Sequence, residues 1–114
     1  MGRIVKNYTK VVNLTPHAVN ILGAIFPPSG TVARVEVEQE YLHNIMMAGI
    51  EVPVYSNTYG AIEHLPEPQE GTLYIVSGLV KAATSREDVV APDTGKSAVR
   101  NDKGHIQSVV RVVG

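Results

Sequence analysis

The sequence of 114 residues contains no cysteine, which excludes disulfide frameworks, thiolate nucleophiles and cysteine-ligated zinc or iron–sulfur sites. It has no apolar run near the ~18 residues of a membrane-spanning helix, and residues 1–10 lack the apolar stretch of a signal peptide. Ten basic and eleven acidic side chains leave a net charge of −1, so no uniform positive field is available for nucleic acid. We therefore expect a cytoplasmic protein that binds neither membranes nor nucleic acids.

The residues that are present favour a small, strand-rich globular protein. Hydrophobic residues make up 44% of the chain and charged residues 18%, which is enough apolar material for a core. Eighteen valines and eight isoleucines stand against six leucines, and β-branched side chains favour strands. We expect one domain, residues 1–114, of the α+β class. Its small antiparallel or mixed sheet could close into a barrel.

The hydrophobic pattern predicts where the elements lie. Expected strands cover residues 10–14, 18–22, 31–37, 50–55, 59–65 and 72–76, with a polar turn at 56–58 and a last hairpin of 97–101 with 104–113. Between 38 and 48 the period changes, because apolar residues recur at three- and four-residue steps before Gly49. This spacing predicts a short helix over 38–48. Ser77 is a suitable cap for a helical turn over 77–84.

Short motifs that resemble catalytic signatures fail on their context. Asp93-Thr94-Gly95 spells the aspartic-protease triplet, but only nineteen residues follow it, so an Asx-type turn is favoured. A phosphate-binding loop ending at Gly95 would need a glycine where Val90 stands. The four histidines lack the close spacing of local metal ligands. No catalytic residue, metal or cofactor is predicted.

A set of polar side chains lies where strand ends and loops are expected to meet: His17, Ser29, Arg34, Tyr59, Arg86, Asp88, Asp93 and Arg100. Arginine offers a planar fork for carboxylate or phosphate, and tyrosine offers a ring and a hydroxyl. We interpret these eight residues as a ligand-binding set. The alternative is that Arg34, Arg86 and Arg100 form surface ion pairs with Glu36, Asp88 and Asp93.

His17 follows Thr15-Pro16 at the end of a strand, where the backbone must turn. Its imidazole either points into a pocket or bonds the backbone carbonyls of the corner. The second role is favoured, because tight corners containing proline commonly use the polar side chains beside them.

Several short segments occur in a fixed order: VNLTPH (12–17), PSGTVAR (28–34), YG (59–60), LPEP (65–68), YIVS (74–77) and DVVAP (88–92). This succession resembles a group of small uncharacterised proteins carried by bacteriophages, prophages and mobile elements. The group has no agreed activity from which catalytic residues could be transferred, so the resemblance implies a habitat rather than a mechanism. The amphipathic segment between Val37 and Gly49 looks longer than the group's usual connection.

The resemblance implies an accessory protein of the bacterial host cytoplasm that is not an enzyme. We expect it to bind and sequester a small phosphate-bearing ligand, such as a nucleotide signal of anti-phage defence. We also expect a homo-oligomer, because residues 108–113 would otherwise expose an apolar strand edge. One alternative is a virion or assembly protein that has no ligand pocket. A second alternative is a small hydrolase or lyase that uses His17 with Asp88 or Asp93.

Overall fold

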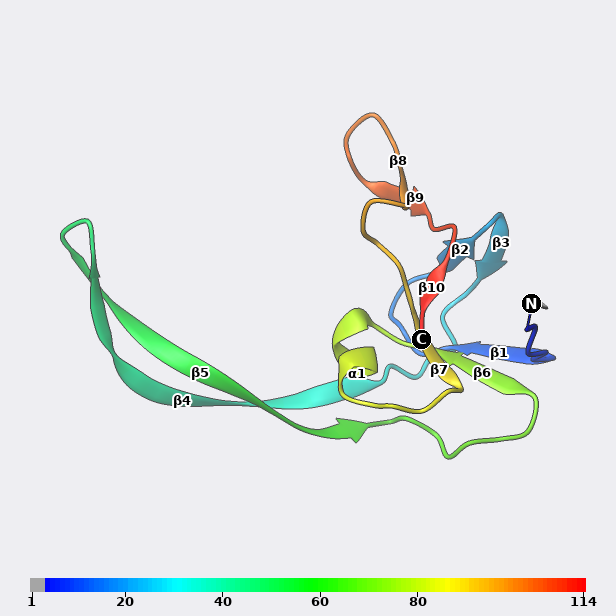
Figure 1. The fold of residues 1–114 in the computed structure, drawn as a ribbon, viewed down its shortest axis with the longest axis horizontal. Helices are drawn as coiled ribbons and strands as arrows, with labels where there is room; N and C mark the ends of the chain where they lie inside the picture. Colours follow the sequence, from blue (N-terminus) through cyan, green and yellow to red (C-terminus); the bar gives the residue numbers. More distant parts are fainter. Residues whose placement is uncertain (1–3) are drawn as a thin grey trace.

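The computed structural model describes residues 4–114, which form ten strands and one short helix (Figure 1). Four strands make a central sheet in the order β1-β6-β7-β10, namely β1 (Lys10–Asn13), β6 (Thr72–Ile75), β7 (Val89–Pro92) and β10 (Val112–Val113). The first three run parallel to one another, and β10 is antiparallel to β7. The sheet is therefore mixed, as the sequence predicts. It is open, so the barrel allowed by the sequence prediction is wrong.

The core lies where β6 and β7 meet helix α1 (Gly78–Ala82). The Ser77 hydroxyl accepts a hydrogen bond from the Val80 amide, which satisfies one of the free donors at the start of the helix. This confirms the helical turn predicted over 77–84. The buried cluster combines three valines, a leucine and an alanine with one aromatic ring and consists of Leu14, Ala33, Tyr74, Val76, Val80 and Val89.

Two long strands, β4 (Arg34–Met47) and β5 (Ile50–Glu63), form a hairpin that leaves the core. Only Ala48 and Gly49 separate them, with φ angles of 49° and 87°. Positive φ at both residues makes this a type I′ turn, whose twist matches that of paired strands. The helix predicted over 38–48 is therefore wrong, because the glycine taken as its stop is the second residue of a hairpin turn.

A bulge explains why this strand resembles a helix in sequence. Tyr41 pairs with Tyr55 and His43 with Val54, so Leu42 is an extra residue on β4. An extra residue interrupts the alternation of a strand and leaves apolar residues three and four positions apart. The polar turn predicted at 56–58 is also wrong, because these residues pair with 40–38 inside the hairpin.

Two smaller hairpins complete the fold: β2 (Val19–Ile21) with β3 (Ala24–Phe26), and β8 (Val99–Arg100) with β9 (Ile106–Ser108). The hairpin predicted from 97–101 and 104–113 is correct only in its first part. Val109 is buried and bridges Ile21, and the chain then joins the central sheet as β10. Burial of Val109 against β2 thus ends the pairing with β8.

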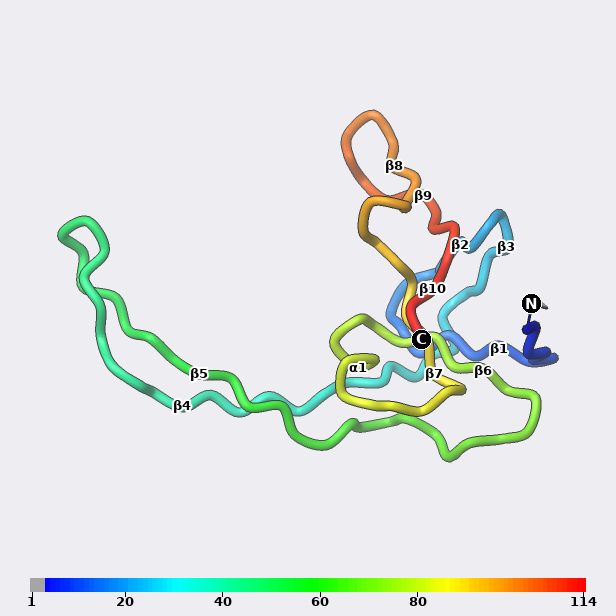
Figure 2. The backbone as a smooth tube through the Cα atoms, viewed as in Figure 1, coloured from blue at the N-terminus to red at the C-terminus, as the bar shows by residue number. Residues whose placement is uncertain are grey.

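The long hairpin gives the molecule an extended shape. Its radius of gyration is 17.8 Å and its extents are 55 × 38 × 37 Å, whereas a compact chain of this length has a radius of gyration of roughly 13 Å. The tube view shows the outer part of the β4–β5 hairpin standing away from the other elements (Figure 2). Within residues 4–114, no helix has the length and apolar character needed to cross a bilayer.

Candidate functional site

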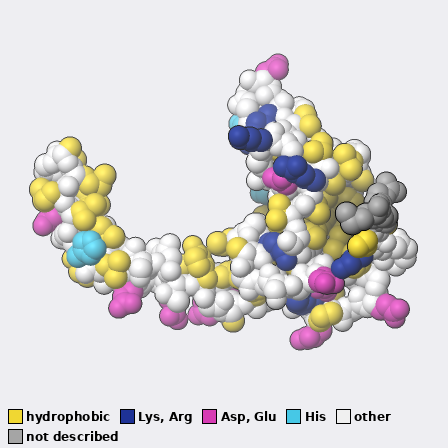
Figure 3. Space-filling view, viewed as in Figure 1, with side chains coloured by type: hydrophobic (Ala, Val, Ile, Leu, Met, Phe, Trp, Pro, Cys, Tyr) yellow, Lys and Arg dark blue, Asp and Glu magenta, His cyan; other side chains and the backbone are white. Residues whose placement is uncertain are grey.

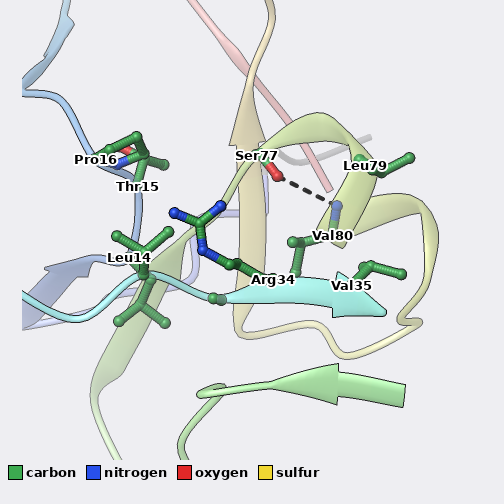
Figure 4. Close-up of a pocket in the computed structure, with 10 residues that line it drawn as sticks. Leu14, Thr15, Pro16, Arg34, Val35, Ser77, Leu79 and Val80 are labelled. Atoms are coloured by element: carbon green, nitrogen blue, oxygen red, sulfur yellow. Dashed lines mark hydrogen bonds between the residues drawn. The ribbon is translucent and has the colours of Figure 1, made fainter. Parts of the chain in front are cut away.

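Arg34 lies in a cleft of ≈ 320 Å³ between residues 14–16, the start of β4 and the beginning of α1. Its guanidinium extends between Thr15 and the Ser77 end of the helix (Figure 4). Leu14, Val35 and Val80 contribute apolar walls. Within the part of the chain that the structure describes, no ion pair or side-chain hydrogen bond engages this guanidinium. The cleft therefore contains a planar cationic donor group with no acceptor from the protein.

Tyr59 lines a smaller cavity of ≈ 100 Å³ with Leu79, Ala82 and Ala83. Leu79 also lines the Arg34 cleft, so the two hollows share one wall. A guanidinium can bind phosphate through paired hydrogen bonds, and a tyrosine ring can stack on a flat group. Arg34 and Tyr59 are the two predicted residues whose placement suits one ligand with an anionic and an aromatic part.

His17 lies apart from Arg34, on a third cavity of ≈ 310 Å³ that is lined by residues 17–20 and 106–109 with Pro92 and Thr94. Its imidazole is exposed, but its backbone carbonyl accepts a hydrogen bond from Asn13 Nδ2 at 2.8 Å and lies 2.9 Å from Thr15 Oγ1. The favoured expectation that the imidazole holds the corner is therefore wrong. The backbone carbonyl of His17, and not its imidazole ring, makes the hydrogen bond that holds the corner.

Asn13 is the residue that holds this corner, and sequence reasoning missed it. Its side chain is buried and makes four hydrogen bonds, donating to the carbonyls of His17 and Phe26 and accepting from the Thr15 amide and hydroxyl. These bonds use both donors and both sides of the acceptor of an asparagine amide. An asparagine at a strand end two residues before a threonine was the available signal, because Asx side chains bond backbone amides two residues on.

Arg86 and Asp88 pair with each other, as the surface-pair alternative predicts for them. Arg86 Nε and Nη2 donate to the two Asp88 oxygens at 2.9 and 2.7 Å, and Nη1 donates to the Pro66 carbonyl. The guanidinium also lies 5.8 Å from the centre of the Tyr74 ring. These contacts hold the 66–71 loop against the core. The same contacts occupy the guanidinium of Arg86 and the carboxylate of Asp88, which the sequence analysis assigned to ligand binding.

The hydrogen bond from Arg86 lowers the pKa of Asp88 below its ordinary value of 3.8, and the same bond raises the pKa of Arg86. A carboxyl group whose folded-state pKa is depressed stabilises the fold above its unfolded pKa and loses that contribution as pH falls toward the folded value. We expect the stability of the native protein to decrease as pH falls below about 4. Asp88→Asn should show a shallower decrease, measured by urea unfolding between pH 2.5 and 7. Parallel curves for the two proteins would contradict this role of Asp88.

Asp93, Arg100 and Ser29 have hydrogen-bond partners within the protein. Asp93 accepts from the Gly95 amide, which confirms the Asx-type turn, and from Arg111 Nε, whose hydrogen bond lowers the pKa of Asp93. Arg100 donates to the carbonyls of Gly104 and Thr94, and Ser29 Oγ lies within hydrogen-bond distance of Thr31. The surface-pair alternative also pairs Arg34 with Glu36 and Arg100 with Asp93. Neither pair occurs among the ion pairs of residues 4–114.

Comparison with protein-family models, with curated proteins and with solved structures found no match. In residues 4–114, no three histidine, aspartate or glutamate side chains lie close enough to hold a metal ion. Within residues 4–114, no hydrogen bond joins His17 to Asp88 or Asp93, whose carboxylates accept hydrogen bonds from Arg86 and Arg111. The Arg34 cleft and the long hairpin are the two features of the described residues that remain without an assigned structural role.

Proposed function

We propose that this protein is a non-enzymatic binding protein that holds a small phosphate-bearing ligand in the Arg34 cleft. The observation that supports this proposal is the Arg34 guanidinium, which extends into a cleft of ≈ 320 Å³ without a protein acceptor. A cleft of this size lies at the lower end of small-molecule sites. The ligand places its phosphate against Arg34 and a flat group toward Tyr59.

A nucleotide fits this description, because it combines a phosphate with an aromatic base. The sequence resembles small proteins carried by bacteriophages. The nucleotide in this proposal is therefore a signal of anti-phage defence, which the protein sequesters in the bacterial cytoplasm. Of the eight residues of the original set, Arg34 and Tyr59 keep a binding role in this proposal. The contacts of Arg86, Asp88, Asp93 and Arg100 favour structural roles for them.

A virion or assembly protein is the second candidate, and a specific observation favours it. The β4–β5 hairpin exposes large apolar side chains along its length, as expected of an element that is covered by another chain. A hydrolase or lyase that uses His17 is a weaker alternative, because Asp88 and Asp93 are held by Arg86 and Arg111.

Native mass spectrometry of the purified chain, with and without a panel of cyclic and linear nucleotides, tests the proposal. A binding protein retains a nucleotide with unchanged mass. An enzyme converts the ligand, and an assembly protein retains none. Detection of no nucleotide by native mass spectrometry and by calorimetry would contradict the proposal.

Arg34→Gln should weaken binding of a retained nucleotide by about 10- to 100-fold, since a charge-assisted hydrogen bond contributes ~1.5–3 kcal/mol. The fold should be intact, because Arg34 is exposed and contributes nothing to the buried cluster. Lys103→Gln removes the same charge from the exposed β8–β9 loop and is the matched control. Isothermal titration calorimetry should separate the two variants. An equal loss of affinity in both would indicate a general effect of net charge.

A further inference from the structure

The outer part of the long hairpin, residues 36–61, is here called the arm, and the rest of the chain the body. Val35 and Ile62 pack at the edge of the core, and beyond them the arm projects from the body (Figure 1). Along the arm, large apolar side chains are between 39% and 66% exposed: Val37, Tyr41, Leu42, Ile45, Met46, Met47, Ile50, Tyr55 and Tyr59. A single two-stranded hairpin is at best marginally stable in water. The exposed apolar side chains of the arm therefore require another protein surface to cover them.

Both faces of the arm are apolar, so the cover must enclose it. Tyr41 and Tyr55 are paired across the strands with their ring centres 5.6 Å apart. Ile45 and Val52 are paired nearer the tip, and Val52 is three positions from Tyr55 on one strand. Because side chains alternate between the faces of a strand, the two pairs lie on opposite faces. A flat surface would cover only one of them.

The charges indicate what the cover is. The arm contains four glutamates and neither lysine nor arginine, whereas the rest of the chain contains ten basic and seven acidic residues. Glutamates on the arm repel nucleic acid and the anionic surface of a membrane. The segment 94–114 of the body is basic, with four basic residues and one acidic residue. The space-filling view shows acidic side chains along the arm and basic ones grouped on the body (Figure 3).

The body also has a groove that complements the arm. Half of the residues that line the ≈ 310 Å³ cavity are apolar, including Val19, Pro92, Ile106 and Val109. It lies beside the β8–β9 hairpin, which belongs to the basic segment 94–114. That segment contains Lys96 and Lys103. An apolar groove with basic neighbours matches an apolar arm with glutamates between its hydrophobic residues. Within one chain the arm extends away from β2 and β9, which contribute residues to this groove (Figure 1).

The exposed area of the single chain is sufficient for such a contact. The chain exposes 8282 Å², whereas a compact protein of its mass exposes roughly 6,100 Å². The excess is about 2,000 Å², and a stable interface of ordinary size buries about 800 Å² from each partner. Strands of 14 residues extend about 46 Å, which is long enough to cross the face of a neighbouring body.

We propose that the arm of each copy docks in the apolar groove of another copy of the same chain, with its glutamates facing Lys96 and Lys103. Exchange of arms in a two-fold pair satisfies both arms and both grooves at once. Each arm is then enclosed between the neighbour's body and the neighbour's arm. This inference does not depend on a ligand in the Arg34 cleft, because neither the arm tip nor the groove contributes to that cleft.

Sedimentation equilibrium of the full chain between 1 and 100 µM tests the proposal. We expect the native protein to have a mass of twice 12.3 kDa or a larger whole multiple. The double variant E38K/E40K should raise the dissociation constant at least 10-fold, because it places positive charge against a basic surface. The double variant K96E/K103E should also raise the dissociation constant at least 10-fold, because it places negative charge against the glutamates of the arm. The control E67K/E70K makes an equal change of charge in a body loop and should leave the assembly unchanged.

Combining E38K/E40K with K96E/K103E should restore association to within threefold of the native constant, because the swapped charges again attract. Far-UV circular dichroism verifies that each variant is folded, and the body variant remains informative if the arm variant is not. A native chain that is monomeric at 100 µM would overturn the proposal. An assembly that neither charge reversal weakens, or that the combined variant does not restore, would also overturn arm-to-groove docking.

Discussion

Asn13→Ala is expected to lower the free energy of unfolding by about 3 kcal/mol, because a polar group left without its partner costs ~1–3 kcal/mol. The substitution removes four hydrogen bonds at a buried position and releases the corner at residues 13–17 from the Phe26 carbonyl. Some of the released groups will bind water, so the cost is smaller than the sum of four losses. In a thermal melt this corresponds to a decrease in Tm of about 15 °C. Urea unfolding followed by circular dichroism measures the free energy.

Two matched variants show whether the asparagine amide is responsible. His17→Gln should change stability by less than about 0.5 kcal/mol, since the imidazole is exposed and the backbone carbonyl is retained. Asn13→Asp should destabilise the fold at neutral pH at least as much as alanine does. It places a carboxylate oxygen opposite two carbonyl oxygens, and protonation in acid should relieve part of the loss. An alanine variant as stable as the native protein would refute this role of Asn13.

Arg86→Gln is expected to lower the free energy of unfolding by about 2 kcal/mol, because bonds between charged groups contribute more than neutral ones. The variant loses both bonds to Asp88, the bond to the Pro66 carbonyl and the contact with the Tyr74 ring. The pair is partly shielded from solvent, with side-chain exposures of 26% and 17%. Chemical denaturation at pH 7 measures the change.

A double-mutant cycle with Asp88→Asn separates the ion pair from the other contacts of Arg86. We expect a coupling energy of about 1 kcal/mol, because residues in one network are not additive. The affinity of folded Arg86→Gln for any retained nucleotide should equal that of the native protein. A variant of native stability that binds the nucleotide more weakly would instead support the original assignment of Arg86 to the ligand site.

Features that depend on a few neighbouring residues were predictable from the sequence alone. Ser77 caps the helix because its hydroxyl reaches an amide three residues on. The Asp93-Thr94-Gly95 turn is closed by a side chain two residues away. The short apolar strands at Lys10–Asn13 and Thr72–Ile75 follow from β-branched composition. For the cap and the turn, the stabilising contact lies within the segment that the pattern describes.

The sequence by itself thus determined a strand-rich α+β chain, the short helix after Ser77 and the Asp93-Thr94-Gly95 turn, because composition, local geometry and short-range hydrogen bonding specify them. Only the tertiary structure decided that residues 36–61 form an arm, since the bulge at Leu42 and the pairing with β5 cannot be read from the spacing of apolar residues. It also decided that Arg86 has a carboxylate partner while Arg34 extends into a cleft without one. Two arginines have the same chemistry in a sequence, and their roles differ because the long-range packing of strands determines which groups lie within reach of each.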